Sequence, residues 1–154
     1  MRYMGLDLGN RTCGVAFSDP MGIIATSHGT IRFREKDLQK CLESVIILIS
    51  EKKVDKVVLG NPINMNGTIG PQAEYVKEFK KMLEDTANIE VILYDERLTS
   101  VEVNKIMITA DLSRAKRKDK VDTLAATLIL QSYLDSKRWK GDLKIWMKIK
   151  IIII

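Results

Sequence analysis

Cysteine is scarce in this chain, which carries only Cys13 and Cys41 among its 154 residues. Two isolated thiols exclude a disulfide framework, and their spacing does not match the paired cysteines of a zinc site. No secretory signal stands before them. Both are therefore expected to be reduced thiols of a cytosolic protein.

Long apolar runs are missing too, as are repeats, low-complexity segments and interdomain linkers. No stretch approaches the roughly 20 apolar residues that span a bilayer, so no membrane association is expected. A hydrophobic content of 45% beside 29% charged residues is ordinary for a globular chain and gives no sign of disorder. The sequence predicts one domain over 1–138. An isoleucine-rich tail over 139–154 suggests an extra strand, a dimer edge or an aggregation-prone end.

Neither sign of charge dominates, since 25 lysines and arginines stand against 20 acidic residues, for a net charge of +5. This excess makes an anionic partner plausible without specifying one. The chain has one histidine, His28, inside a β-prone segment. A lone histidine there is expected to be a surface or packing residue, so the chemistry has to come from other side chains.

The stretch over 3–18 predicts a strand, a tight turn at the Gly-Asn dipeptide 9–10 suited to positive φ, and a second antiparallel strand. Asp7 lies in the middle of the first apolar run, where a carboxylate is costly to bury unless it is paired or binds a metal. Alternation puts Asp7 on the same face as Tyr3 and Gly5, and the glycine leaves space beside the carboxylate. Two interpretations stay open for Asp7, a metal ligand and a polar residue at a hairpin end.

Periodicity along the rest of the chain predicts an α/β fold, a mixed five-stranded sheet flanked by helices. The expected elements are a strand over 22–33, a helix over 36–53, a strand over 56–60, a loop over 61–70, a helix starting at 71, a strand over 89–94, a helix from 99 to about 108 that opens on a capping box, a hydrophilic connection over 111–120 and a helix over 119–136.

Three acids from distant parts of the chain are expected at one edge of this sheet, where α/β proteins place their sites. Asp7 lies near the end of the first strand, Glu96 just past the last, and Asp122 on a helix face lined with alanines. Clustered carboxylates repel one another, which favours Mg²⁺ or Mn²⁺ between them. Two such ions can activate water and stabilise the leaving oxygen in phosphodiester hydrolysis. Asp95 is the substitute if Glu96 points away, and a first-turn acid stabilising its own helix is the alternative for Asp122.

Four sequence blocks, in order along 2–135, resemble the YqgF (RuvX) family. They are Leu6-Asp7-Leu8-Gly9-Asn10-Arg11 with Gly14-Val15-Ala16, Gly60-Asn61-Pro62 with Asn64-Met65-Asn66-Gly67-Thr68, Asp95-Glu96-Arg97-Leu98-Thr99-Ser100, and Lys120-Val121-Asp122 with Ala125-Ala126 and Ile129-Leu130. The resemblance implies an RNase H-like fold related to the RuvC resolvases. It also implies a nuclease, a hydrolase acting on ester bonds, that matures the 5′ end of precursor 16S rRNA, with Asp7, Glu96 and Asp122 as catalytic acids and metal ligands.

Several basic and loop residues are expected to contact the nucleic acid. These assignments have alternatives. The glycine-rich loop over 61–67 could be purely structural, and the basic residues between Arg114 and Lys120 could simply be the solvated start of a helix. Arg97 could brace the site instead of binding phosphate. The expected substrate-binding residues are Arg11, Asn64, Asn66, Gly67, Arg97, Arg117, Lys118 and Lys120.

Competing functions remain at this point. The partner is expected to be RNA or branched DNA, and a Holliday junction resolvase would need two sites in a homodimer, whereas an RNA nuclease can be a monomer. A ribosome-assembly factor could keep the fold without turnover. Sugar kinases and actin-like ATPases also begin with a strand, Asp-x-Gly and a hairpin, but they need two such domains around the nucleotide.

Overall fold

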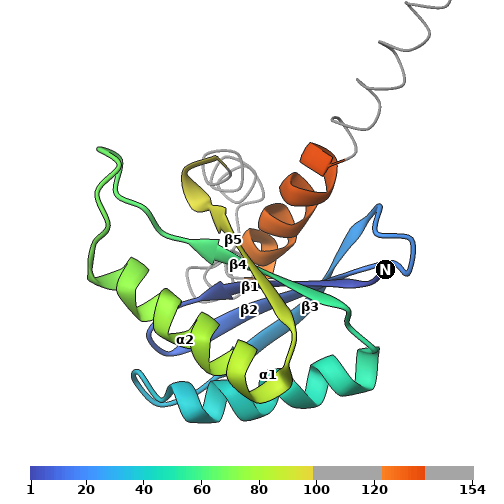
Figure 1. Cartoon of the computed structure of the whole chain (residues 1–154), viewed down its shortest axis with the longest axis horizontal. Coiled ribbons are helices and arrows are strands. Elements are labelled where there is room, and N and C mark those ends of the chain that lie inside the picture. The colour runs from blue at the N-terminus through green and yellow to red at the C-terminus, as the bar shows by residue number, and fades with distance from the viewer. Residues whose placement is uncertain (99–122, 138–154) are drawn as a thin grey trace, which may run out of the picture.

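The computed structural model describes residues 1–98 and 123–137, which form a sheet covered by helices on both faces (Figure 1). The five strands lie in the order β3-β2-β1-β4-β5. In chain order the elements are β1 (Tyr3–Leu8), β2 (Thr12–Ser18), β3 (Ala25–Arg32), α1 (Leu38–Lys52), β4 (Lys56–Asn61), α2 (Pro71–Ala87), β5 (Glu90–Asp95) and the 3₁₀ turn η1 (Glu96–Leu98). Residues 123–137 are helical as well, and are called the 123–137 helix below.

The sheet is mixed, as the sequence predicted. β1 pairs antiparallel with β2 and parallel with β4, and β4 pairs parallel with β5. The crossovers that join these parallel strands carry α1 and α2, which lie together on one face of the sheet (Figure 1). β1 therefore occupies the middle of the sheet, and its carboxyl end lies beside the carboxyl end of β4.

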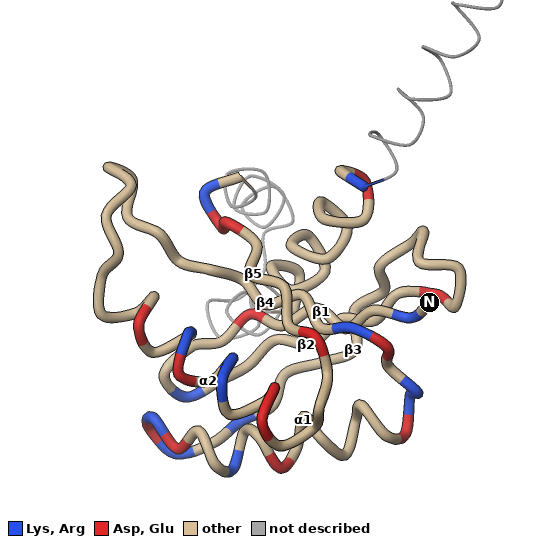
Figure 2. The backbone as a smooth tube through the Cα atoms, viewed as in Figure 1, with Lys and Arg blue, Asp and Glu red and all other residues tan. Residues whose placement is uncertain are grey.

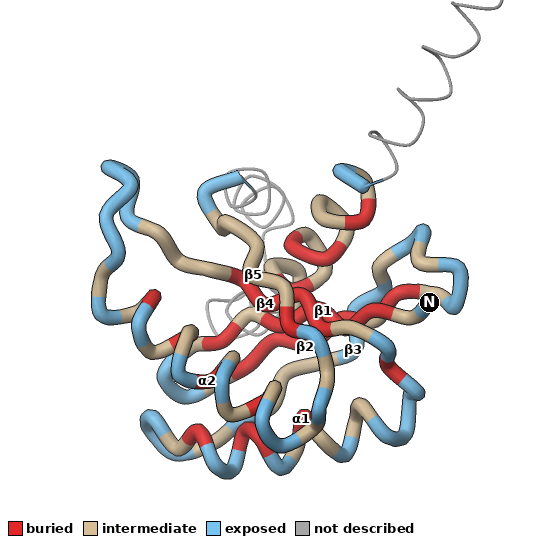
Figure 3. The backbone as a smooth tube through the Cα atoms, viewed as in Figure 1, coloured by how far each residue is buried: buried red, intermediate tan, exposed pale blue. Residues whose placement is uncertain are grey.

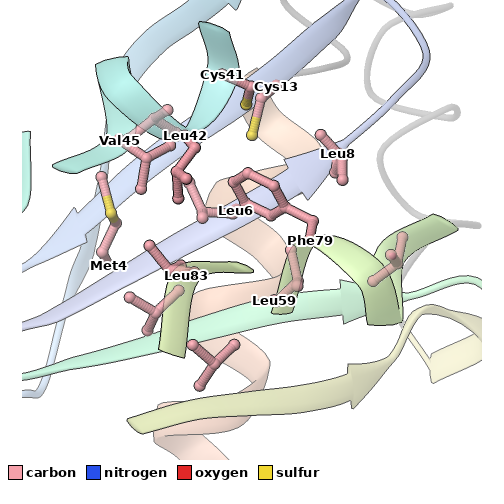
Figure 4. Close-up of a cluster of buried hydrophobic side chains, with 14 of the residues drawn as sticks. Met4, Leu6, Leu8, Cys13, Cys41, Leu42, Val45, Leu59, Phe79 and Leu83 are labelled. Carbon is pink, nitrogen blue, oxygen red and sulfur yellow. The ribbon is translucent and has the colours of Figure 1, made fainter. Parts of the chain in front are cut away.

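Alternation along β1 builds two cores, one on each face. Met4 and Leu6 are fully buried against α1 and α2, where Phe79 and both cysteines complete the larger cluster (Figure 4). Tyr3 faces the other way, into a smaller cluster with the 123–137 helix. Among the described strands, β1, β2 and β4 in the interior of the sheet are mostly buried, whereas the edge strands β3 and β5 are largely not (Figure 3). Cys13 and Cys41 form no disulfide and have no exposed surface.

The 123–137 helix approaches the sheet closely because the strand beneath it carries a glycine. A Cβ atom at Gly5 would lie 2.7 Å from Leu130 Cβ and 2.9 Å from the Ala126 carbonyl oxygen. The expectation that the alanine face permits close packing is therefore confirmed, whereas the space that Gly5 was expected to leave beside the Asp7 carboxylate is filled by this helix. From residue 123 to 134 the helix carries no charged side chain, which suits a face buried on a sheet (Figure 2).

The turn between β1 and β2 differs from the prediction. Neither Gly9 nor Asn10 is among the described residues with positive φ. The Gly9 N–H donates across the hairpin at 2.7 Å, which places the turn one residue later, at Asn10 and Arg11. The carbonyls of both turn residues accept hydrogen bonds from the backbone that follows β3. A dipeptide pattern could not reveal this contact, which holds the turn from outside the hairpin.

β3 begins at Ala25, three residues later than predicted, because an aspartate organises the preceding backbone into a turn. The carboxylate of Asp19 accepts hydrogen bonds from the backbone N–H groups of Met21, Ile23 and Ile24 at 2.7–3.0 Å. The apolar side chains of this turn were wrongly assigned to the strand.

α1 begins at Leu38 rather than at residue 36. Lys36 has φ 57°, a left-handed conformation that no α-helix contains. Asp37 then caps the helix, since its side chain accepts a hydrogen bond from the Lys40 N–H at 3.2 Å. α2 begins at Pro71, as predicted.

Several sequence predictions lie outside the described residues. These are the helix over 99–108 with its capping box, the connection over 111–120 and the tail over 139–154. Within the described ranges, no helix is long and apolar enough to cross a membrane.

Candidate active site

Two of the three predicted acids meet on the sheet face that the 123–137 helix covers. Asp7 lies on β1, two residues beyond Gly5, which the helix contacts. On β5 the side chain of Tyr94 packs on the same face. Alternation returns Glu96 to that face and sends Asp95 to the opposite one. The side chain of Glu96 forms a hydrogen bond with Asp7.

The electrostatics of this pair favour a proton or a cation between the two acids. Burial raises the pKa of Glu96 to about 8, and the charge of Asp7, the hydrogen bond with it and the charge of Asp95 act in the same direction. The raised pKa means that Glu96 holds its proton at a higher pH than a free carboxyl group does, and one proton between the two acids allows the hydrogen bond that joins them. A cation that replaces this proton would remove the repulsion between the ionised groups.

Asp95, the predicted substitute for Glu96, is paired with Arg97 and not with Asp7. Its carboxylate accepts from Arg97 Nη2 at 2.6 Å and from Arg97 Nε at 2.9 Å, and its Oδ1 also accepts from the Arg97 backbone N–H at 2.9 Å. The hydrogen bonds with the Arg97 side chain lower the pKa of Asp95. Of the two neighbouring acids, Glu96 is therefore the one that the structure places against Asp7.

Arg97 lies between the Asp95 carboxylate and the loop over 61–70. A Cβ atom at Gly67 would lie 3.9 Å from Arg97 Nη1. Gly67 has φ 85°, so a turn at the loop tip requires this glycine. The structure thus brings Arg97 next to the loop that was expected to border the substrate.

The two loop asparagines stabilise the loop itself. Asn64 Nδ2 donates to Thr68 Oγ1 at 3.0 Å, and Asn66 Oδ1 accepts from the Thr68 N–H and hydroxyl at 3.1 and 2.6 Å. Both asparagines are exposed, and Met65 between them is 89% exposed. These contacts give Asn64 and Asn66 a structural role, and substrate contact remains a prediction for them.

The hairpin that carries Asp7 is fixed from the side by α2. Tyr75 donates its hydroxyl to the Gly9 carbonyl at 3.2 Å, and Gln72 Nε2 reaches the Leu8 carbonyl at 3.5 Å. Arg11 at the turn is exposed and pairs with Glu35 at 3.5 Å. Sequence reasoning did not identify Tyr75 or Gln72, because nothing in a helix pattern shows which polar side chains reach a distant loop.

The third predicted acid and the predicted basic contacts belong to the part of the chain between residues 98 and 123. Asp122, Arg117, Lys118 and Lys120 lie outside the described residues. Within the described ranges the structure shows no group of three potential metal-binding side chains. The helix that begins its described part at Thr123 does pack over the Asp7 face, through Ala126 and its neighbours.

The two acids that meet have the donor chemistry of a hard divalent cation. Carboxylate oxygens are the ligands that Mg²⁺ and Mn²⁺ prefer. The raised pKa of Glu96 shows that ionising both groups together is unfavourable unless positive charge is added. Asp7 and Glu96 therefore fit the group that a metal-dependent nuclease needs, by chemistry rather than by any bound ion.

A feature that sequence reasoning missed is Gly60, at the end of β4. A Cβ atom there would overlap Glu96 Oε1 and would lie 2.8 Å from Ile129 Cδ1. The signal was present in the sequence, as a glycine that ends a buried apolar run. Sequence reasoning placed this glycine in a strand and in a family sequence block but gave it no role at the site, because the space above a strand depends on what packs over it.

The family model RuvX, described as Holliday junction resolvase, matches residues 1–136. A relative from Bacillus subtilis, named "Putative pre-16S rRNA nuclease", is 50% identical over 136 residues, which are 88% of this chain and 99% of the relative. One with the same name from Clostridium tetani is 51% identical over 88% of this chain and 97% of its own length.

Two solved resolvases share the fold at low sequence identity. RuvC of Thermus thermophilus in complex with a Holliday junction substrate superimposes with a TM-score of 0.55 at 12% identity, covering 84% of this chain and 91% of RuvC. The fowlpox virus resolvase in complex with junction DNA gives a TM-score of 0.53 at 15% identity, covering 88% and 98%. The RNase H-like fold and the family predicted from the four sequence blocks are confirmed. The chain belongs to the RuvX family, a family of nucleases.

Proposed function

We propose that this protein is a divalent-cation-dependent nuclease that hydrolyses phosphodiester bonds of RNA, and that it processes the 5′ end of precursor 16S rRNA. The observation that carries the proposal is the meeting of Asp7 and Glu96 on one face of the sheet, with the pKa of Glu96 raised to about 8. The names of relatives about 50% identical over nearly their whole length support the substrate.

In this mechanism Asp7, Glu96 and Asp122 would hold Mg²⁺ or Mn²⁺. A bound ion of this kind activates water as a nucleophile and stabilises charge on the phosphate and on the leaving oxygen. Asp7 supplies a carboxylate from the rigid centre of the sheet. Glu96 would bind the ion in its ionised form, and Asp122 would contribute from the position just before the 123–137 helix.

The remaining predicted residues would hold the sugar-phosphate backbone. Arg97 keeps Asp95 neutralised and presents its outer Nη1 toward the loop tip at Gly67. Arg11 at the exposed hairpin turn stands directly before β2, the strand that pairs with the Asp7 strand. Asn64, Asn66, Arg117, Lys118 and Lys120 complete the proposed backbone contacts.

The proposal assigns the activity to a nuclease domain over 1–138 and gives no part in it to the tail over 139–154. The family match over 1–136 supports this division. We place the protein in the cytoplasm, where precursor rRNA is processed, as a monomer or homodimer.

A second candidate is a Holliday junction resolvase acting on branched DNA. The description of the matching family model and the fold shared with RuvC favour it. A junction has two symmetric strands to cut, so this function requires a dimer with two copies of the acid pair. The mass of the protein in solution therefore helps to separate the two candidates.

The test is a cleavage assay with Mg²⁺ or Mn²⁺ on three labelled substrates: a precursor 16S rRNA 5′ region, an unstructured RNA and a four-way DNA junction. Wild type is compared with Asp7→Asn, which keeps the size of the side chain. We expect cleavage of the precursor by wild type alone. Equal cleavage by Asp7→Asn, or no cleavage of any substrate with either metal, would refute the nuclease; cleavage of the junction alone would select the second candidate.

A further inference from the structure

Gly60 lies in a strand, where glycine is normally unfavourable. It pairs with Tyr94 within the β4–β5 ladder and is fully buried. Glycine weakens a strand because it loses more conformational freedom than other residues and offers no side chain to pack. The described glycines with positive φ are Gly22, Gly29 and Gly67, so the backbone at Gly60 does not require glycine. The reason for it lies in the space above.

That space is occupied by the second acid. Glu96 follows β5, the neighbour of β4, and its side chain turns back over Gly60 to reach Asp7 on the far side of β4. A Cβ atom at residue 60 would overlap Glu96 Oε1 and lie 3.1 Å from Glu96 Cδ. Even alanine would therefore compete with the carboxyl group for one position.

A second glycine on the same face makes space for something else. A Cβ atom at Gly5 would meet Leu130 Cβ at 2.7 Å and the Ala126 carbonyl oxygen at 2.9 Å, both part of the 123–137 helix. A methyl group at residue 5 would push a helix away, whereas one at residue 60 would mainly push away a carboxyl group. Ile129 Cδ1 also approaches residue 60, at 2.8 Å, but it is the tip of a side chain that can rotate.

We propose that Gly60 is a positioning residue for the second acid. Because Gly60 has no side chain, the space above β4 is open between β1 and β5. The Glu96 side chain can therefore cross β4 and share one site with Asp7. The consequence for catalysis rests on the proposed nuclease function, but the steric relation between Gly60 and Glu96 does not. Substitution of Gly60 removes the acid pair without changing either acid.

The test is a double-mutant cycle in urea unfolding without metal. Gly60→Ala is measured in wild type and in Glu96→Ala, which removes the carboxyl group that the new methyl would strike. We expect Gly60→Ala to lower the unfolding midpoint in wild type and to lower it by less than half as much in Glu96→Ala. Gly5→Ala is the matched control, with the same loss of midpoint in both backgrounds, because its clash is with the helix.

Folding failure is informative in this design. If Gly60→Ala is unfolded but Gly60→Ala/Glu96→Ala folds, the clash is with the carboxyl group, as proposed. If Gly60→Ala and Gly60→Ala/Glu96→Ala are both unfolded, or if Gly60→Ala lowers the unfolding midpoint equally in wild type and in Glu96→Ala, the clash is with the helix and the inference is wrong.

Cleavage then tests the consequence. Where Gly60→Ala folds, we expect kcat to fall by at least about tenfold with KM little changed, since the substrate contacts remain while the acids separate. Glu96→Asp in the Gly60→Ala background shortens the acid by one methylene and should recover part of the loss. Wild-type kcat in Gly60→Ala would overturn the positioning role. An inactive wild type with the expected unfolding cycle would instead refute the nuclease and leave the steric relation intact.

Discussion

Replacing Glu96 with glutamine should change how the stability of the metal-free protein depends on pH. In the folded chain burial and the charge of Asp7 raise the pKa of Glu96 from 4.5 to about 8. The folded state therefore holds the proton more tightly than the unfolded state. The contribution of this bound proton to the free energy of unfolding is complete below pH 4.5 and is lost as the pH rises through 8. Glutamine has the same size and no ionisable proton, so this loss is absent from Glu96→Gln.

The size of the effect follows from the two pKa values. Between about pH 6 and about pH 9, linkage for a group shifted from 4.5 to about 8 removes close to 3 kcal/mol of unfolding free energy. Glu96 is partly exposed, and water reaching the ionised pair reduces the repulsion. We therefore expect Glu96→Gln to gain about 1–3 kcal/mol relative to wild type over this range.

The assay is urea unfolding of both proteins in the presence of a chelator at several pH values. Other groups titrate in the same range, but they are common to both proteins and cancel in the difference. A difference that stays constant with pH, or that falls as the pH rises, would refute the conclusion that Glu96 is held protonated against Asp7.

Three further outcomes are expected. Asp7→Asn should abolish cleavage and leave RNA binding within a few-fold of wild type, because it removes a proposed metal ligand and no proposed backbone contact; binding by filter retention checks this, and a loss of binding equal to the loss of cleavage would contradict it. Removing divalent cations with a chelator should stop cleavage, and restoring Mg²⁺ should recover it; activity that persists would exclude the metal mechanism. Tyr75→Phe deletes the hydroxyl that donates to Gly9 at 3.2 Å and should cost about 1 kcal/mol of unfolding free energy, measured by urea unfolding; an unchanged midpoint would show that the bond contributes nothing.

Most of the architecture could be predicted because its signals are local. Apolar runs of strand length and three- and four-residue spacing indicated the order of strands and helices up to β5, and alternation along β1 assigned Asp7 to the face opposite Leu6. The predicted ends of strands and helices were wrong where the backbone conformation is set by a contact or a dihedral angle that a local pattern does not show. The turn at Asn10 is held by the segment after β3, and Lys36 adopts a left-handed conformation that a helical pattern does not reveal.

The candidate site was predictable to the level of residue type and strand end, and less so in detail. The choice between Asp95 and Glu96 depended on which way each side chain points after β5, and only the structure shows Asp95 paired with Arg97. The role of Gly60 is a matter of empty volume, which depends on the packing of Glu96 and of the 123–137 helix above the strand. No pattern within β4 carries that information.

The two buried thiols allow the rate at which the larger core opens to be measured in the native protein. Cys13 and Cys41 are fully buried in the layer between the sheet and α1, and neither is in a disulfide. A thiol-specific reagent can therefore modify them only while that layer is apart, so the rate of labelling under native conditions counts these events. Labelling of these two native thiols therefore shows, without any engineered probe, whether a ligand bound at the acid pair on one face of the sheet slows the opening of the core on the other face.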